Sequence, residues 1–389
     1  MVCRFAALLG FITYTTLALS PLSAPHQMHD FHVVGRPLRA GMIKLAPGID
    51  KEKPIGGADF AGATVFGDTA ILNFEDGWVG AINLHTRKLV WSFQSKAGLS
   101  VPPIISGKWL VFCLQDGRVL KVDGDSLKLD SQVLQKRVWE TQLDSFVARQ
   151  GVLVDERTLI LVSANQTLYA LDFETGKNLW NPYDAGAPEN LAIRNIAPAL
   201  VSGGVIYFGV ASGDIVALKL ANGEQIFRYN LHYRHSRFKD PIGDMRVYGS
   251  YLVLTLASGV AMSIRTDNPS LLSPGWVEPI LVNSITANFF RQKRFYFGTA
   301  NGYVYSHDVE TGAKNWEAYV GGSVSHLKGG ENFLLVVCSD GKVLQLVPAT
   351  GEVLWADDLK GSIVAPPMMH NKTTYVMTQS GVLYGFKIE

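Results

Sequence analysis

One pattern of residues recurs along nearly the whole chain. The full pattern is an apolar run, a glycine, a stretch of alternating apolar positions, and then Thr-Gly followed by a Trp. The clearest copies are Glu75–Trp91, Ala164–Trp180, Ala300–Trp316 and Ser339–Trp355. In three of them the Trp lies fourteen residues after the glycine. A unit this short cannot bury its apolar face alone, so the chain has to fold as an array of packed repeats.

Weaker copies fill the gaps between the clear ones. The turn positions are 77, 117, 166, 213, 259, 302, 341 and 381, and they are 39 to 49 residues apart. Gln166 replaces the turn glycine in one copy, and Phe227 replaces the Trp in another. Eight units of this size predict an all-β fold, an eight-bladed β-propeller with four strands in each blade.

The residues within each unit favour strands over helices. Large apolar residues alternate with small or polar ones, as at Tyr169, Leu171 and Phe173, which is the period of a strand. The turn glycine predicts a tight hairpin, and Thr-Gly predicts a second turn. We expect the Trp to pack between neighbouring blades, since it carries the largest apolar surface of the repeat.

The two ends of the array predict how the ring closes. The last unit opens at Gly381 and reaches Glu389 without a further Thr-Gly-Trp strand. We expect Gly41–Ala46 to supply the missing strand, because pairing the first strand with the last blade removes two open sheet edges. The propeller is therefore predicted to span residues 41–389, after a proline-containing tether at 25–40.

The first residues have the pattern of an export signal. A short basic start, Met1–Arg4, precedes an apolar run, Phe5–Ser20, and a small-residue site at 22–24. This run is short for a membrane-spanning helix, so the sequence predicts a signal peptide over residues 1–24.

Composition excludes several classes of function. The chain has 35 basic and 34 acidic residues, so its charge does not favour nucleic acid or an anionic membrane as partner. The 47% hydrophobic content is enough for a large core without a stapling metal or disulfide. Cys113 and Cys338 are expected to be buried free thiols. The histidines before residue 40 and the basic cluster at 232–237 are interpreted as solvated segments, with anion binding by the cluster as the alternative.

The repeat resembles that of propellers related to pyrroloquinoline-quinone (PQQ) dehydrogenases, which share a turn glycine followed by A-x-D-x-x-T-G-x-x-x-W. The resemblance covers residues 41–389 and implies the fold rather than the cofactor. Those dehydrogenases resemble one another in a pair of adjacent cysteines beside the quinone, and this chain has no Cys-Cys pair. The sequence therefore predicts no catalytic residue, no metal and no cofactor. A PQQ-dependent periplasmic dehydrogenase is the alternative.

Within this group the size, the export signal and the ending at 381–389 are similar to the propeller subunits of the outer-membrane β-barrel assembly machinery. That resemblance implies a monomeric, non-enzymatic scaffold in the periplasm, at the inner face of the outer membrane. Its partners would be the periplasmic (POTRA) repeats of the barrel-forming subunit and, further, unfolded outer-membrane proteins. Members of the family usually carry a lipid-anchor cysteine after the apolar run, whereas here Cys3 precedes it. A generic periplasmic protein-binding propeller is a second alternative.

Two segments resemble the family's contact loops. The stretch from Pro188 to Pro198 matches an apolar-x-apolar-Arg loop followed by Ala-Pro, which implies that Leu191, Ile193 and Arg194 contact the partner. The segment from Asp240 to Asp244 resembles a second loop on the same surface, with its two aspartates as contact residues. Aliphatic and Arg side chains together are typical of a protein-binding hot spot. The alternative is a strand start, with Leu191 and Ile193 packed inward and Arg194 solvated.

Overall fold

The computed structural model describes residues 39–44, 63–73, 77–86, 88–127, 137–186, 197–231, 240–279, 284–359, 361–363, 365–370, 372–379 and 382–387. The chain divides into two units, Met1–His32 and Val33–Glu389, and everything described belongs to the second. The predicted signal peptide and most of the predicted tether lie outside the described residues. So do Leu191, Ile193 and Arg194.

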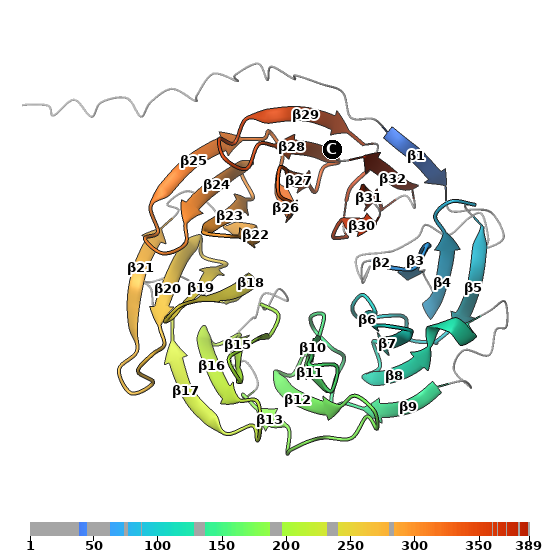
Figure 1. Ribbon diagram of the computed structural model, residues 1–389, viewed down its shortest axis with the longest axis horizontal. Coiled ribbons are helices and arrows are strands. Elements are labelled where there is room, and N and C mark those ends of the chain that lie inside the picture. The colour runs from blue at the N-terminus through green and yellow to red at the C-terminus, as the bar shows by residue number, and fades with distance from the viewer. Residues whose placement is uncertain are drawn as a thin grey trace, which may run out of the picture. The chain divides into compact units, whose positions relative to one another are not determined.

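The described strands form eight four-stranded antiparallel sheets, arranged as the blades of a ring (Figure 1). Blade 1 consists of β2 (Thr64–Phe66), β3 (Thr69–Asn73), β4 (Trp78–Asn83) and β5 (Leu89–Gln94). Blade 2 consists of β6 (Ile104–Ser106), β7 (Trp109–Cys113), β8 (Arg118–Asp123) and β9 (Arg137–Gln142), with a short 3₁₀ helix, η2 (Gly124–Ser126), after β8. Blade 3 consists of β10 (Val152–Val154), β11 (Thr158–Val162), β12 (Thr167–Asp172) and β13 (Tyr183–Asp184). Blade 4 consists of β14 (Leu200–Ser202), β15 (Val205–Val210), β16 (Asp214–Lys219) and β17 (Gln225–Asn230).

The second half of the ring repeats this plan. Blade 5 consists of β18 (Pro241–Tyr248), β19 (Tyr251–Leu256), β20 (Val260–Arg265) and β21 (Ser273–Pro279). Blade 6 consists of β22 (Ile285–Arg291), β23 (Arg294–Thr299), β24 (Tyr303–Asp308) and β25 (Lys314–Tyr319). Blade 7 consists of β26 (Val324–Gly329), β27 (Leu334–Cys338), β28 (Lys342–Leu346) and β29 (Val353–Asp358). Blade 8 consists of β30 (Met368–His370), β31 (Thr373–Met377), β32 (Val382–Lys387) and β1 (Arg39–Lys44).

Each blade runs from the centre of the ring outward in chain order, with the first strand innermost and the fourth outermost (Figure 1). Blade 8 is the exception, because its outermost strand is β1, which pairs antiparallel with β32. The predicted eight-bladed propeller and its closure by an N-terminal strand are therefore confirmed. The closing strand begins at Arg39, two residues before the predicted start at Gly41.

The predicted turn glycines sit in the hairpins between the second and third strands. Seven of the eight turn positions are described, and all seven have a positive φ, from 66° at Gln166 to 111° at Gly341. Glycine adopts this conformation without the steric penalty that a Cβ brings, so its recurrence there follows from the hairpin geometry. Gln166 is the one position of the seven where a side chain accepts that penalty.

The hydrophobic core lies between the blades. Each cluster of buried apolar residues in the described chain joins two adjacent blades, and the clusters together follow the whole ring. In β7, for example, Leu110 and Phe112 pack against blade 1, whereas Val111 and Cys113 pack against blade 3. The middle strands are therefore buried on both faces, so they read as continuous apolar runs rather than as the expected alternation.

The fourth-strand Trp residues pack across blade boundaries, as predicted. Trp139 of blade 2 donates a hydrogen bond from Nε1 to the carbonyl of Phe173 in blade 3, at 3.0 Å. Trp180, Trp276 and Trp316 each make the equivalent bond to the following blade at 3.1 Å. A buried indole N–H needs such a partner, so these bonds hold each Trp side chain in one orientation.

In the part of the chain that the structure describes, there is no helix long and apolar enough to cross a membrane.

Candidate binding face and central channel

One face of the ring carries both the turn hairpins and the links between blades; we call it the connection face. It follows from the chain order, since the second-to-third strand hairpin and the exit from the fourth strand lie at the same end of each blade. The first predicted contact loop falls in the link from β13 to β14, and the second straddles the end of the next link, from β17 to β18, with Asp240 in the link and residues 241–244 in β18. Both links therefore start and end on the connection face.

A backbone hydrogen bond joins the ends of these two links. The Ala197 N–H, three residues after Arg194, donates to the carbonyl of Pro241 at 2.9 Å. Pro241 also covers Gly209 of β15, where a methyl group would lie 2.9 Å from the proline Cβ. The structure therefore brings the residues next to both predicted contact loops together at the boundary of blades 4 and 5. Leu191, Ile193 and Arg194 themselves lie outside the described residues, and their roles stay predictions.

The structure separates the two aspartates of the second loop. Asp240 is buried, with 3% of its surface exposed, and its carbonyl accepts a hydrogen bond from the Ala257 N–H at 2.9 Å. Asp244 is exposed and lines the central channel. The two side chains therefore occupy different environments. Their roles in partner binding stay predictions.

A β-bulge in β18 causes this separation. The pairing of β18 with β19 shifts between Ile242 and Arg246, so the intervening residues leave the ladder. Gly243 within the bulge has a φ of +65°. Bulges of this kind redirect side chains and are frequent beside functional sites.

Asn288 of β22 holds the bulge from the neighbouring blade. Its Oδ1 accepts from the Asp244 N–H at 2.7 Å, and its Nδ2 donates to the Asp244 carbonyl at 2.9 Å. Nδ2 also donates to Thr255 Oγ1 at 2.9 Å, and this hydroxyl donates in turn to the carbonyl of Ile242 at 2.7 Å. Asn288 is buried and Thr255 has no exposed surface, so the bulge rests on a satisfied polar network.

The inner strands surround a channel of about 910 Å³. Its described lining comes from blades 2 to 8 and includes three cationic side chains, Arg149, Arg246 and Lys328. Asp244 is the carboxylate of that lining, and His326 lies two positions before Lys328 on β26. The cations come from blades that are separate in sequence, so only ring closure brings them into one space.

Burial shifts the pKa of two groups in the channel. It raises the pKa of the Asp244 carboxyl, while the positive charges of Lys328, Arg149 and Arg246 act in the opposite direction. Asp244 touches the water of the lumen, yet the surrounding wall desolvates it, which is why the first effect prevails. Burial, together with the charge of Arg149, lowers the pKa of His326 to about 4. His326 is therefore neutral at physiological pH, and the channel lining keeps more positive than negative charge.

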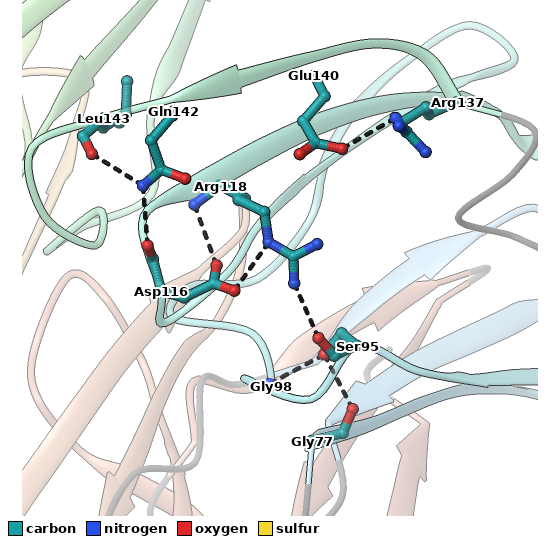
Figure 2. Close-up of polar contacts among 9 residues, drawn as sticks. All are labelled: Gly77, Ser95, Gly98, Asp116, Arg118, Arg137, Glu140, Gln142 and Leu143. Carbon is teal, nitrogen blue, oxygen red and sulfur yellow. Dashed lines mark hydrogen bonds and ion pairs between the residues drawn. The ribbon is translucent and has the colours of Figure 1, made fainter.

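Three cationic side chains on the connection face bind groups of the chain itself: Arg118, Arg228 and Lys342. Figure 2 shows Arg118 of blade 2, whose Nε donates to Asp116 at 2.8 Å and whose Nη2 donates to the carbonyl of Ser95 in blade 1 at 2.9 Å. In the same network Gln142 Nε2 donates to the carbonyl of Asp116 at 2.9 Å. These contacts fasten the link of one blade to the hairpin of the next.

The same device recurs around the ring. Arg228 of blade 4 donates to Asp214 at 2.7 Å and to the carbonyl of Ala185 in blade 3 at 3.1 Å. Lys342 of blade 7 donates to the carbonyl of Gly321 at 2.8 Å. We therefore assign these charges to the fold rather than to a binding site.

The histidines before residue 40 and the basic cluster at 232–237 lie outside the described residues, and the two cysteines are structural. Cys113 and Cys338 are buried free thiols, as predicted, and burial raises the pKa of each to about 12. Thiols held protonated in this way are poor nucleophiles. Within the described ranges, no three His, Cys, Asp or Glu side chains converge in an arrangement that could hold a metal ion.

Sequence reasoning missed the channel cluster of Arg149, Arg246, His326 and Lys328, and it missed Asn288. No spacing links these residues, because they lie on different blades. A usable signal was the pair Gly243-Asp244 inside a strand start, since a glycine there is typical of a bulge.

Comparison with known protein families gives a consistent result. The model of a family described as outer membrane protein assembly factor BamB matches residues 75–318 and 300–389. A protein of that name from Bordetella pertussis is 23% identical over 340 residues, 82% of this chain and 81% of that protein. A second, from Legionella pneumophila, is 25% identical over 210 residues, 51% of this chain and 52% of that protein. The dehydrogenase subunit of a quinone alcohol dehydrogenase from Gluconobacter oxydans is 23% identical over 201 residues, 50% of this chain but 22% of that protein.

Solved structures share the fold. The crystal structure of BamB from Moraxella catarrhalis superposes with a TM-score of 0.70 at 17% identity, over 90% of this chain and all of that one. Sqt1 from Saccharomyces cerevisiae reaches a TM-score of 0.68 at 12% identity, over 87% of this chain and 97% of that one. At these identities the likeness extends to the architecture alone.

Proposed function

Because the chain belongs to the family of outer membrane protein assembly factor BamB, we propose that it is a non-enzymatic scaffold of outer-membrane protein assembly. The observation that supports this most directly is the match of the family model to residues 75–318 and 300–389, which include all or part of every blade. The two relatives that carry the same name point the same way. We further propose a periplasmic location at the outer membrane, reached through a signal peptide at 1–24 and a tether at 25–40.

The docking surface that we propose is the connection face at blades 4 and 5. There the scaffold binds the POTRA repeats of the barrel-forming subunit through Leu191, Ile193 and Arg194, beside the segment from Asp240 to Asp244. The bond between Ala197 and Pro241 supports this placement, since it holds the ends of the two loops together. A rim of apolar side chains around an Arg is the composition expected of such a contact.

Affinity purification from a mild-detergent envelope extract tests the proposal. The tagged wild-type protein should recover an outer-membrane barrel that carries periplasmic repeats, identified by mass spectrometry. An Arg194→Glu variant should lose that partner while it keeps the melting temperature of the wild type. Arg157 is the matched control, because it is exposed in the β10–β11 turn on the opposite face, so Arg157→Glu should retain the partner. Equal recovery by both variants would count against this docking surface.

The match to a quinone dehydrogenase subunit motivates a second test. That match spans 22% of the dehydrogenase, which is compatible with shared propeller repeats. The purified protein, incubated with pyrroloquinoline quinone and calcium, should give neither a bound-quinone absorbance nor oxidation of alcohols or sugars. Turnover in that assay would replace the scaffold proposal with an enzymatic one.

A further inference from the structure

We propose that the central channel binds a small ligand that carries two or more carboxylate or phosphate groups. This site does not depend on partner binding at the proposed docking surface, although Asp244 lines the channel and also belongs to the segment beside that surface. The ligand would lie at the level of the β18 bulge, among side chains from blades 3, 5 and 7.

The described lining of the channel carries an excess of positive charge. Of the described side chains that line the channel, Arg149, Arg246 and Lys328 are cationic, and Asp244 is anionic. Three positive charges against one negative charge leave an excess of two. The channel walls are protein of low dielectric, which concentrates the field of this excess in the lumen. A ligand with at least two negative charges therefore complements the site, whereas a single carboxylate compensates only half of it.

The protein around the channel desolvates the Arg149 side chain. Burial lowers the pKa of the Arg149 guanidinium, and the charge of Asp244 only partly offsets that effect. The same cation acts on His326 in blade 7, so these two lining residues of different blades lie close enough for the charge of Arg149 to be felt across the channel. A desolvated guanidinium forms strong charge-assisted bonds with a carboxylate or phosphate, since the geometry of these groups matches its planar fork of donors.

A polar network holds the β18 bulge at the wall of the channel. A regular strand would not need Asn288, Thr255 and the positive φ of Gly243, yet all three combine to hold the bulge of β18. A methyl group at Gly243 would lie 2.5 Å from Asn288 Oδ1, so the close approach requires glycine. This network positions Asp244 and Arg246 at the channel wall on a rigid element, as a ligand site requires.

The contrast with the connection face makes the assignment specific. Arg118, Arg228 and Lys342 donate to backbone carbonyls of the preceding blade and thereby stabilise the ring. The channel cations line a partly open space of about 910 Å³ at the centre of the ring, which is large enough for a small organic anion.

Isothermal titration calorimetry on the full propeller tests the site. The probes are citrate, inorganic pyrophosphate and, as the monovalent reference, acetate. Citrate or pyrophosphate should bind to the wild type and acetate should not, and the preferred probe tells whether carboxylates or phosphates are favoured. Arg149→Gln and Lys328→Gln should each weaken binding by about tenfold, since each removes a charge-assisted contact. Arg265→Gln is the matched control, because Arg265 is exposed and paired with Asp267 outside the channel lining.

Asp244→Asn provides a test of opposite sign. Removal of the Asp244 charge should tighten binding of the same probe. If the channel cations only neutralise charges within the fold, no variant should bind the probe. His326 offers a direct readout by NMR, with its signal assigned through His326→Gln. A bound anion should move the titration of His326 to higher pH, since it compensates the charge of Arg149.

The outcomes separate clearly. Binding that weakens in the Arg149 and Lys328 variants, strengthens in Asp244→Asn and shifts the His326 titration supports the site. Absence of binding to the folded wild type, or binding that Arg149→Gln and Lys328→Gln leave unchanged, overturns it. Thermal melts of each variant, followed by circular dichroism, distinguish loss of the site from loss of the fold.

Discussion

Trp316 of blade 6 covers Gly351 of blade 7, and a methyl group on that glycine would lie 2.6 Å from the indole ring. Its Nε1 donates to the carbonyl of Pro348 in the same turn at 3.1 Å. The same pairing recurs at three other boundaries: Trp139 with Gly176 and Trp276 with Gly312, both in Thr-Gly turns, and Trp180 with Gly223, in an Asn-Gly turn. The Thr-Gly and the Trp of the repeat are therefore partners across a boundary, although each copy of the repeat contains both.

Where the repeat departs from its pattern at two blade boundaries, both the Trp and the facing turn are affected. Phe227 stands in place of the Trp in blade 4, and blade 5, which follows it, has an Asn-Pro-Ser loop where Thr-Gly is expected. Trp355 of blade 7 faces blade 8, which lacks the turn, and there Nε1 donates to Gln345 of its own blade at 2.6 Å. The loss of one partner accompanies a change in the other.

The Trp–Gly contact can be tested by adding a single methyl group. Gly351→Ala should lower the free energy of unfolding by about 1–3 kcal/mol beyond the cost of the backbone conformation, since the methyl group overlaps Trp316. Gly204→Ala is the control, because Gly204 has a φ of +77° against +78° for Gly351, with no atom within 4 Å of an added Cβ. It should cost only the conformational penalty of about 1–2 kcal/mol. Equal urea midpoints for the two variants would contradict the proposed contact.

Gln166 should be better than glycine at its own position. Its Oε1 accepts from the Ala211 N–H of blade 4 at 2.6 Å, and its Nε2 donates to the Gly186 carbonyl at 3.2 Å. Gln166→Gly relieves about 1 kcal/mol of backbone strain but removes two hydrogen bonds to the neighbouring backbone, at about 1–3 kcal/mol in total. We expect a net loss of stability in thermal melts. A rise in the melting temperature would show that strain outweighs the bridge.

Asn288→Ala should loosen the β18 bulge. The substitution removes both bonds to the Asp244 backbone and the bond to Thr255, so a loss of about 2 kcal/mol is expected. Hydrogen exchange at the Asp244 amide should accelerate more than exchange elsewhere in blade 5. Asn222→Ala removes contacts in an exposed turn and should change stability by less than about 0.5 kcal/mol. Unchanged exchange at Asp244 would mean that the bulge is stable without its clamp.

His326 should make the propeller less stable in acid. Its pKa is about 4 in the folded protein and about 6.5 when unfolded, so the unfolded state takes up the proton first as the pH falls. Stability is therefore lost below about pH 6.5, by at most about 1.4 kcal/mol per pH unit down to pH 4, and less where lumen water relieves the burial. His326→Gln should flatten that slope in denaturant titrations between pH 4 and 6.5 and leave it unchanged above. Parallel slopes for the two proteins would contradict the depressed pKa.

The architecture could be predicted because its signals are local. The turn glycines, Thr-Gly and Trp lie within one copy of the repeat, and the Gln166 exception could be counted from the same spacing. The closing strand was found because the last copy is incomplete. The double burial of strands such as β7 was less evident, since the sequence pattern does not show that each sheet has a neighbour on both sides.

The channel could not be predicted in the same way. Arg149, Asp244 and Lys328 are about ninety residues apart in sequence and meet only because the ring closes. Asp240 and Asp244 look equivalent in the sequence. In the structure Asp240 is buried and Asp244 lines the channel, on either side of the start of a bulge that another blade holds in place. Side chains that act together across blades leave no spacing to read.

The pairing of β1 with β32 sets the order in which this protein can be completed. A chain that emerges with its N-terminus first has to keep the strand Arg39–Lys44 without its partner until Val382–Lys387 has arrived, after the strands of blades 1 to 7 have been made. Blades 1 to 7 are each made of consecutive strands and can assemble earlier, so closure of blade 8 is the contact with the greatest sequence separation and the slowest to form. Until that moment, an unpaired edge remains at each end of the growing array, available to any extended segment nearby.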